Sequence, residues 1–426
     1  MTTADALVIK GGEPVSGTVE VSGAKNSTLP ILAASLMAEH PCLLTGVPRL
    51  RDVGTMVELM EILGTKVSWD RTKKRIEVSP GSPNHEAPYD VVKRMRASVL
   101  VLGPVLAKLG KAKVSMPGGC AIGVRPINLH LKALQQMGAD ITVEGGYVIA
   151  SCKRLKGTNI VFDKVTVTGT ENVVMAASLA EGTTTIENAA REPEVVELCS
   201  VLRKMGARIH GDGTPTITVE GVESLSGFTH RVMPDRIEAA TLLMVGPITG
   251  GRIRVEGAVP EHLDAVLLKL REAGIEVEVQ EDGTMEAWRG GDSILPVECS
   301  TWPYPGFPTD VQAQLMALLS LAKGTSLITE NIFEDRFQHV AELSRMGANI
   351  TVSDRKAVIQ GVEHLTGAPV MASDLRASAS LVLAALAARG ESIVSRVYHL
   401  DRGYEQLDQK LARLGVEIER IKRPVG

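Results

Sequence analysis

Hydrophobic and polar positions repeat along the chain with a long period. Six segments have apolar residues at helical spacing, end in Leu-x-x-x-Gly or a close variant, and lead into an apolar, strand-like stretch. The closing glycines lie 68 to 74 residues apart and are Gly64, Gly138, Gly206, Gly274, Gly347 and Gly415. Glycine is typical just after a helix, because that position often adopts a left-handed backbone conformation. The pattern predicts six copies of one repeat, each with an amphipathic surface helix.

A second helix in each repeat is apolar around nearly its whole circumference, which predicts burial. These core segments are 29–38, 97–107, 172–180, 239–248, 313–322 and 381–388. Short strand-like stretches such as 183–189, 251–259 and 391–398 fill the gaps between the helices. The order within a repeat predicts an α/β (α+β) fold made of β-α-β-α-β-β units, with three units in each half of the chain.

The two ends of the chain predict how the repeats close. The last repeat stops at residue 426 without the strands that should follow its surface helix, whereas residues 1–24 carry such strands. The simplest closure lets residues 1–24 complete the last repeat. A chain of 426 residues also exceeds one compact core. We therefore expect one domain at 25–233 and a second made of 1–24 plus 234–426.

Composition limits the classes of function. Aromatic residues make up 3 % of the chain and the formal net charge is −4, which argues against a nucleic-acid partner. The five cysteines show no metal-ligand spacing, so we expect no metal and a reducing, cytoplasmic setting. No signal-peptide core is visible, and the longest apolar runs, of about a dozen residues, are too short to cross a membrane. A nucleotide-binding glycine loop of the GxxxxGK[ST] type is absent, and we expect no cofactor and no obligate protein partner.

Polar residues open each core helix and keep the period of the repeat. They are Lys25-Asn26, Arg96, Thr170-Glu171-Asn172, Asp235-Arg236, Thr309-Asp310 and Asp374 with Arg376. One interpretation is helix capping, which suits Asp310, Asp374, Asp235 and Thr170. It does not suit Lys25, Arg96, Arg236 and Arg376, because a cation opposes the dipole at a helix N-terminus unless an anion is bound there. If the helices of both domains face a shared cleft, these residues form a site for a phosphorylated substrate with acid/base chemistry.

A glycine-rich segment, residues 115–126, contains Cys120 and Arg125. It is either a plain glycine turn with an incidental thiol, or a loop that presents a reactive thiol beside cations, able to act as general acid or nucleophile. The other cysteines, Cys42, Cys152, Cys199 and Cys299, lie in strand-like or helical apolar surroundings and are interpreted as structural.

Motifs over most of the chain resemble one family. The segments 23–38, 92–104, 117–139, 168–194, 307–314 and 374–405 carry the likeness, in order. They resemble the UDP-N-acetylglucosamine 1-carboxyvinyltransferases, a branch of the enolpyruvyl transferases. The resemblance implies an inside-out α/β barrel with two domains around a cleft that closes on ligand. It also implies transfer of enolpyruvyl from phosphoenolpyruvate to the 3′-hydroxyl of UDP-N-acetylglucosamine with release of phosphate, by addition and elimination. This reaction opens peptidoglycan precursor synthesis, on which cell shape and division depend.

The resemblance also implies roles for individual residues. Cys120 would be the catalytic acid or covalent thiol, Asp310 the base for the sugar hydroxyl, and Lys25 a catalytic cation. Lys25, Arg125 and Arg402 would hold phosphoenolpyruvate, and Asn26 would lie between the two substrates. The nucleotide sugar would be lined by Arg96, Arg125, Pro126, Ile127, Asn128, Leu129, Lys164, Val165, Thr166, Val167, Asp310 and Ile332. Asp374 and Arg376 would belong to the same cleft, and Arg402 would open a surface helix.

Two details of the motifs affect what the resemblance implies. The family often has aspartate where this chain has Asn128, which still offers a donor and an acceptor to a uracil ring. A cysteine at position 120 implies alkylation by the epoxide fosfomycin. Two alternatives stay open, namely the sister enzyme acting on shikimate 3-phosphate and a catalytically silent repeat protein that binds an anion.

Overall fold

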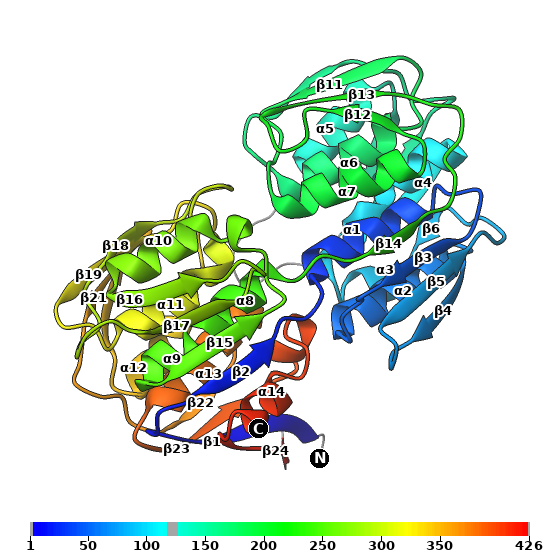
Figure 1. Cartoon of the computed structure of the whole chain (residues 1–426). Coiled ribbons are helices and arrows are strands. Elements are labelled where there is room, and N and C mark those ends of the chain that lie inside the picture. The colour runs from blue at the N-terminus through cyan, green and yellow to red at the C-terminus, as the bar shows by residue number, and fades with distance from the viewer. Residues whose placement is uncertain (1–2, 117–126, 425–426) are drawn as a thin grey trace. The chain divides into compact units, whose positions relative to one another are not determined.

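The computed structural model describes residues 3–116 and 127–424 (Figure 1). The chain divides into two compact units. The inserted unit contains residues 23–116 and 127–233, and the terminal unit contains residues 3–22 and 234–424. Each unit holds three repeats and has its own hydrophobic core.

The inserted unit begins with α1 (Lys25–Ser35), and its helices alternate with short strands. Its other helices are α2 (Arg51–Ile62), α3 (Tyr89–Val92), η1 (Arg96–Val101), α4 (Leu102–Leu109), α5 (Asn128–Gln136), α6 (Val167–Ala177) and α7 (Pro193–Lys204). Its strands are β3 (Cys42–Thr45), β4 (Lys66–Asp70), β5 (Arg75–Ser79), β6 (Glu86–Ala87), β7 (Lys111–Ser115), β8 (Asp140–Glu144), β9 (Tyr147–Ser151), β10 (Asn159–Val161), β11 (Thr183–Glu187), β12 (Arg208–His210), β13 (Thr216–Glu220) and β14 (Thr229–Arg231).

The terminal unit takes β1 (Thr3–Gly11) and β2 (Gly17–Glu20) from the start of the chain. Its helices are α8 (Arg236–Leu243), α9 (Val245–Thr249), η2 (Pro260–His262), α10 (Asp264–Glu272), η3 (Thr309–Val311), α11 (Gln312–Leu319), α12 (His339–Arg345), α13 (Leu375–Ala387), η4 (Leu400–Arg402) and α14 (Leu407–Arg413). Its other strands are β15 (Arg252–Glu256), β16 (Ile275–Val279), β17 (Met285–Arg289), β18 (Glu298–Ser300), β19 (Thr325–Thr329), β20 (Asn349–Ser353), β21 (Lys356–Gln360), β22 (Pro369–Met371), β23 (Gly390–Ser395) and β24 (Glu417–Pro424).

All six sheets in the described part of the chain have four strands and the same pattern of parallel and antiparallel pairing. In the sheet β10-β11-β13-β12, for example, the first pair is parallel and the other two pairs are antiparallel. The sheets β6-β7-β9-β8 and β18-β19-β21-β20 repeat this arrangement. The structure confirms the predicted β-α-β-α-β-β repeat.

The two ends of the chain meet in one sheet, as predicted. Strand β1 pairs antiparallel with both β23 and β24, so it completes the last repeat. The expectation was wrong for β2, which pairs in parallel with β15 and belongs to the fourth repeat. Strand β14 takes the equivalent place beside β3 in the first repeat. Each strand that precedes a passage between the units is therefore paired within the unit that the chain is leaving.

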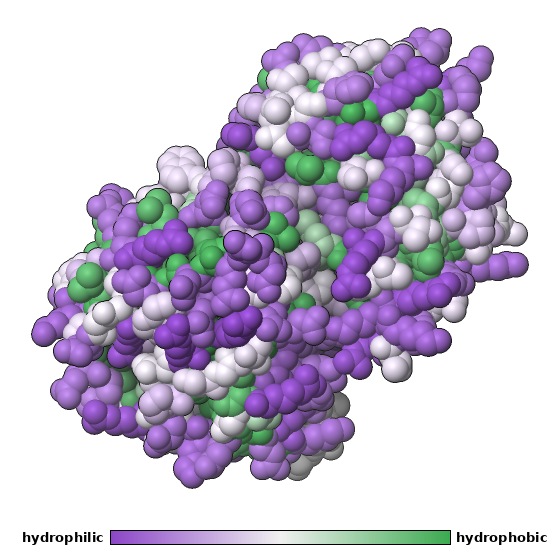
Figure 2. Space-filling model, viewed as in Figure 1, coloured by the Kyte–Doolittle hydropathy of each residue, from purple (hydrophilic) through white to green (hydrophobic). Residues whose placement is uncertain are grey.

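The apolar helices form the centre of each unit, with the sheets outside them (Figure 1). Close contacts between core helices depend on small residues. A Cβ on Gly103 in α4, for instance, would lie 2.4 Å from the backbone oxygen of Asn172 in α6. Hydrophilic side chains predominate on the face drawn in Figure 2, where apolar side chains occur in small groups. No helix among the described residues is long and apolar enough to cross a membrane.

The structure confirms the predicted ends of the surface helices, but two of the predicted core helices are not continuous. All six predicted glycines have positive φ, from 75° at Gly274 to 105° at Gly206, which confirms their place after the surface helices. The core segments 97–107 and 239–248 are each broken in two rather than continuous. Pro104 and Pro247 lack the N–H groups that would bond to Leu100 and Leu243, so a continuous helix would lose a hydrogen bond at each point.

Candidate functional site

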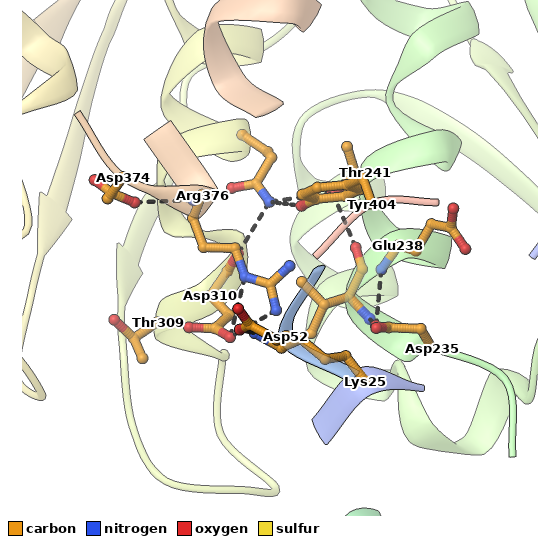
Figure 3. Close-up of polar contacts among 12 residues, drawn as sticks. Lys25, Asp52, Asp235, Glu238, Thr241, Thr309, Asp310, Asp374, Arg376 and Tyr404 are labelled. Carbon is orange, nitrogen blue, oxygen red and sulfur yellow. Dashed lines mark hydrogen bonds and ion pairs between the residues drawn. The ribbon is translucent and has the colours of Figure 1, made fainter. Parts of the chain in front are cut away.

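Asp310 is the centre of a charged cluster in the terminal unit. Its Oδ2 accepts hydrogen bonds from Nε and Nη2 of Arg376, at 3.1 and 2.9 Å (Figure 3). Its Oδ1 accepts one from Nη2 of Arg336, at 2.9 Å. The Arg376 and Arg336 side chains are only 3 % and 5 % exposed, whereas that of Asp310 is 28 % exposed. The guanidinium groups therefore approach from the protein interior and leave part of the carboxylate open to solvent.

The local chain explains why these groups meet. Arg376 is the second residue of α13, whose N-cap Asp374 accepts the N–H groups of Arg376 and Ala377 at 2.8 and 3.0 Å. Burial alone would lower the pKa of Arg376, but the Asp310 carboxylate raises it well above its ordinary value. The arginine therefore stays charged within the core of the terminal unit.

Arg402 lies in the same part of the terminal unit, at the end of η4. Burial lowers the pKa of the neighbouring His399, the Arg402 charge lowers it further, and Asp374 opposes both effects. Such electrostatic influence requires proximity, so Arg402 and Asp374 both lie near His399. The residue after Arg402, Gly403, packs so closely on Leu375 that a Cβ there would lie 2.5 Å from Leu375 Cδ1. Asp374, Arg376 and Arg402 thus belong to one cluster.

Ile332 is held beside the same cluster by a buried carboxylate. Glu330 is fully buried, and its Oε1 accepts the backbone N–H of Ile332 at 2.8 Å. Its Oε2 accepts the hydroxyl of Thr309, the residue before Asp310, at 2.9 Å. This arrangement fixes the loop that carries Ile332 relative to η3.

In the inserted unit, Lys25 is the first residue of α1 and is 8 % exposed. Its Nζ lies 3.4 Å from Oδ2 of Asp52 in the first turn of α2 (Figure 3). Asn26 follows on α1 and is half-buried. The lysine therefore has a carboxylate partner within its own unit.

A chain of hydrogen bonds runs beneath the starts of α5 and α6. Oδ1 of Asn172 accepts the N–H of Gly103 at 2.7 Å, and its Nδ2 donates to the oxygen of Val99 at 2.9 Å, which fixes the orientation of the amide. Nδ2 also donates to Nδ1 of His130 at 3.0 Å, so the ring proton belongs on Nε2, 3.3 Å from Oγ1 of Thr168. This internal network makes His130 a rigid support for the two helix starts.

The charge of Arg96 affects the pKa of His130, which indicates that the two side chains lie near each other. Burial and, to a smaller extent, the Arg96 guanidinium lower the pKa of His130 to about 4, so Arg96 lies near this histidine. Asn128 is the exposed first residue of α5, Leu129 follows it half-buried, and Ile127 is the buried N-cap. Arg96 therefore lies near a buried histidine that follows residues 127–129 in the same helix start.

The segment Lys164 to Val167 forms the start of α6. Thr166 is the N-cap, and its Oγ1 accepts the N–H of Gly169 at 3.2 Å. Lys164 is exposed, while Val165, Thr166 and Val167 are half-buried. A helix N-terminus with a nearby lysine attracts anions, because unpaired N–H groups and the helix dipole both favour negative charge.

Comparison with known proteins identifies the family. The pattern of EPSP synthase (3-phosphoshikimate 1-carboxyvinyltransferase) matches residues 9–411. A UDP-N-acetylglucosamine 1-carboxyvinyltransferase of Nitratidesulfovibrio vulgaris is 56 % identical over 98 % of this chain and 99 % of its own length. One of Myxococcus xanthus is 55 % identical over 98 % of this chain and all of its own. The chain belongs to the UDP-N-acetylglucosamine 1-carboxyvinyltransferase family.

Solved structures agree with this membership. The enolpyruvyl transferase NikO from Streptomyces tendae superposes with a TM-score of 0.89 at 26 % identity, covering 99 % of this chain and 100 % of NikO. The EPSP synthase from Acinetobacter baumannii has a TM-score of 0.76 at 19 % identity over 99 % of this chain and 100 % of its own, a likeness of fold alone. These neighbours confirm the fold class expected for the family. The relatives confirm the family resemblance that the sequence motifs indicated.

The sequence interpretation of the helix starts needs correction. Asp235 and Asp374 are N-caps, as the capping interpretation requires. Thr170 is not a cap, because α6 already begins at Val167 and has Thr166 as its cap. Asp310 is not a cap either, because its carboxylate accepts hydrogen bonds from two arginines. Arg402 ends η4 rather than opening a surface helix, since α14 begins only at Leu407.

Lys25 and Arg376 do not need a bound anion to offset the helix dipole. Lys25 and Arg376 each pair with a carboxylate of their own unit, so protein groups offset the unfavourable helix dipole in this member of the family. Arg236 lies beside its cap, Asp235, and its Cζ is 5.6 Å from the centre of the Tyr304 ring. Three expected site residues, Cys120, Arg125 and Pro126, lie outside the described residues.

Several residues near the expected site were missed from the sequence. Asp52, Arg336 and Tyr404 contact Lys25, Asp310 and Arg376 respectively, from segments distant in the chain. Tyr404 offered a signal, because tyrosine is rare in this chain and this one lies two residues after Arg402. No signal in the sequence singled out Asp52 or Arg336, whose partners lie 27 and 26 residues away. Within the described residues, no group of His, Cys, Asp or Glu side chains could hold a metal ion.

Proposed function

We propose that this protein transfers the enolpyruvyl group of phosphoenolpyruvate to the 3′-hydroxyl of UDP-N-acetylglucosamine and releases phosphate. The observation that carries the proposal is the identity of 54–56 % over 98 % of the chain to relatives named for this activity. The enzyme would thereby begin peptidoglycan precursor synthesis in the cytoplasm. Both substrates are small molecules, and the reaction requires no cofactor.

In the inserted unit, we assign binding of the nucleotide sugar to the region around His130. Arg96, Asn128, Leu129 and the start of α6 from Lys164 to Val167 would contact this substrate, together with Arg125, Pro126 and Ile127. Support comes from the closeness of Arg96 to His130, from the place of Asn128 at the start of α5, and from the anion preference of a helix N-terminus. Lys25, with Arg125, would bind phosphoenolpyruvate, and Asn26 would touch both substrates.

In the terminal unit, Asp310 is proposed as the base that takes the proton of the sugar hydroxyl. The partial exposure of its carboxylate supports this role, because a base must reach the substrate, and the two arginines fix its position from the interior. Ile332 would line the nucleotide sugar, Arg402 would bind phosphoenolpyruvate, and Asp374 and Arg376 would border the same site. The two units would act as domains 25–233 and 1–24 plus 234–426.

Cys120 is proposed as the acid that protonates the methylene carbon of phosphoenolpyruvate, or as a nucleophile that adds to it. Addition to an enol phosphate needs a proton at one carbon and an oxygen nucleophile at the next, so an acid and a base are both required. Departure of phosphate then needs cations that stabilise its charge, which Lys25, Arg125 and Arg402 can supply.

The proposal is tested by measuring phosphate release from phosphoenolpyruvate with either UDP-N-acetylglucosamine or shikimate 3-phosphate as acceptor. We expect release with the nucleotide sugar alone. Release with shikimate 3-phosphate alone would assign the chain to the sister activity, and no release with either would reject enolpyruvyl transfer. A fully active Cys120→Ser variant would remove the acid role from Cys120 without affecting the reaction assigned.

A further inference from the structure

We propose that Tyr404 is a positioning residue that sets the orientation of Asp310 through Arg376 and Gln314. The inference rests on the proposed function, in which Asp310 is the base. Tyr404 is only 1 % exposed, so it does not touch substrate itself. Its effect on the reaction must pass through the groups that it contacts.

Tyr404 contacts two of the three side chains that hold Asp310, one at its backbone and one at its carboxylate. Nε2 of Gln314 donates to the backbone oxygen of Asp310 at 2.9 Å and to the hydroxyl of Tyr404 at 3.0 Å. At the other end, Arg376 holds the Asp310 carboxylate, and its Cζ lies 5.4 Å from the centre of the Tyr404 ring (Figure 3). Tyr404 therefore links the support of the Asp310 backbone to the support of its carboxylate.

The direction of the hydrogen bonds is fixed by the backbone. Oγ1 of Thr241 donates its only proton to the oxygen of Ile237 at 2.9 Å, four residues earlier on α8. It must therefore accept the hydroxyl proton of Tyr404, 3.0 Å away. Tyr404 in turn accepts from Gln314. Each hydroxyl has one defined donor role, so the chain from Gln314 through Tyr404 and Thr241 to Ile237 has a single polarity, and Gln314 also donates to Asp310.

Burial keeps this chain intact. Removal from water raises the pKa of Tyr404, against a smaller opposite effect of Arg376, so the phenol remains neutral and keeps its donor role. The backbone also fixes the ring, since the N–H of Tyr404 donates to the oxygen of Leu400 at 3.0 Å. Close packing of Gly403 on Leu375 brings this turn against the start of α13, which carries Arg376.

The cluster still contains two atoms without a partner. Nη1 of Arg376 and Oε1 of Gln314 are both buried and make no hydrogen bond within the described residues. The aromatic face of Tyr404 offers Arg376 a cation–π contact in place of a further acceptor. The Arg376 guanidinium is positioned by its two bonds to Asp310 and by the Tyr404 ring, so a change at the ring also affects the carboxylate that Arg376 holds.

Removal of the hydroxyl in Tyr404→Phe should lower kcat. The ring and its contact with Arg376 remain, but Gln314 loses one of its three acceptors and Thr241 keeps only Gln314 as a donor, at 3.1 Å, so Asp310 is held less rigidly. Small displacements of a catalytic group reduce turnover strongly. We expect a fall in kcat of about tenfold with KM for both substrates unchanged within twofold. A role confined to folding would instead lower the active fraction and the melting temperature.

The experiment compares steady-state kinetics and thermal unfolding of the native protein, Tyr404→Phe, Gln314→Met and the double variant. Tyr147→Phe is the matched control, because that hydroxyl accepts a backbone N–H at an exposed position of the inserted unit. We expect both single variants to lower kcat and the double variant to be no worse than the poorer single one, as for two links of one chain. Equal kcat in native and Tyr404→Phe protein, or independent additive losses, would overturn the proposal.

Gln314→Met keeps the test decisive if Tyr404→Phe fails to fold, since an unchanged kcat in Gln314→Met also rejects the proposal. Inactivity of the native protein would instead reject the proposed function.

Discussion

Replacing Asp310 by alanine removes the carboxylate that joins two buried guanidinium groups. Arg376 and Arg336 are 3 % and 5 % exposed, so neither can recover its solvation without rearrangement. Breaking a buried ion pair by removing one partner costs about 3–5 kcal/mol of unfolding free energy. Because Asp310 itself is 28 % exposed, we expect a loss near the lower limit, about 3 kcal/mol. For a unit of this size that corresponds to roughly 6–12 °C in melting temperature.

Thermal unfolding followed by circular dichroism measures this loss. The control is Glu417→Ala, which breaks a surface ion pair with Lys10 and should leave the melting temperature unchanged, because both side chains are more than 60 % exposed. Asp310→Asn retains an acceptor oxygen and should be more stable than Asp310→Ala, yet equally inactive if Asp310 is the base. The reasoning fails if Asp310→Ala melts together with Glu417→Ala.

Three other predictions concern Lys25, His130 and Cys120. Lys25→Ala should abolish turnover with an unchanged circular dichroism spectrum, whereas unfolding would indicate a structural role. The folded pKa of His130, about 4, lies below the unfolded value of about 6.5, so its stabilisation is complete above pH 6.5 and lost as pH falls towards 4. Urea unfolding should therefore show native protein losing about 2 kcal/mol more than His130→Gln between pH 7.5 and pH 5, and equal losses would contradict this. Fosfomycin should add its mass to the native protein and leave Cys120→Asp unmodified; an unchanged native mass would refute the thiol assignment.

The repeat and its helix ends could be predicted because they follow local rules. Each of the six surface helices ends at a glycine with positive φ, and this requirement is visible in the sequence at every one of them. Proline alone did not predict the breaks near Pro104 and Pro247, since Pro30 lies inside α1, which continues through it. The pairing of β2 with β15 and of β14 with β3 could not be predicted. A strand of three or four residues does not indicate in its sequence which strand it pairs with.

The charged cluster around Asp310 contains contacts that the sequence could not predict. The sequence singled out Asp310, Asp374 and Arg376 by their period, but it gave no reason to expect Arg336 beside them. It also suggested that arginine and lysine at helix starts await a bound anion, whereas Arg376 and Lys25 have carboxylate partners in the protein. Such pairs depend on side chains from distant segments, and composition and spacing do not encode which segments meet.

The most direct test of enolpyruvyl transfer is the mass of the nucleotide-sugar product formed from carbon-labelled phosphoenolpyruvate. After incubation with native protein, UDP-N-acetylglucosamine should gain the mass of one labelled enolpyruvyl group, with one phosphate released for each product molecule. A nucleotide sugar of unchanged mass, under conditions where the protein is folded, would contradict the proposed function.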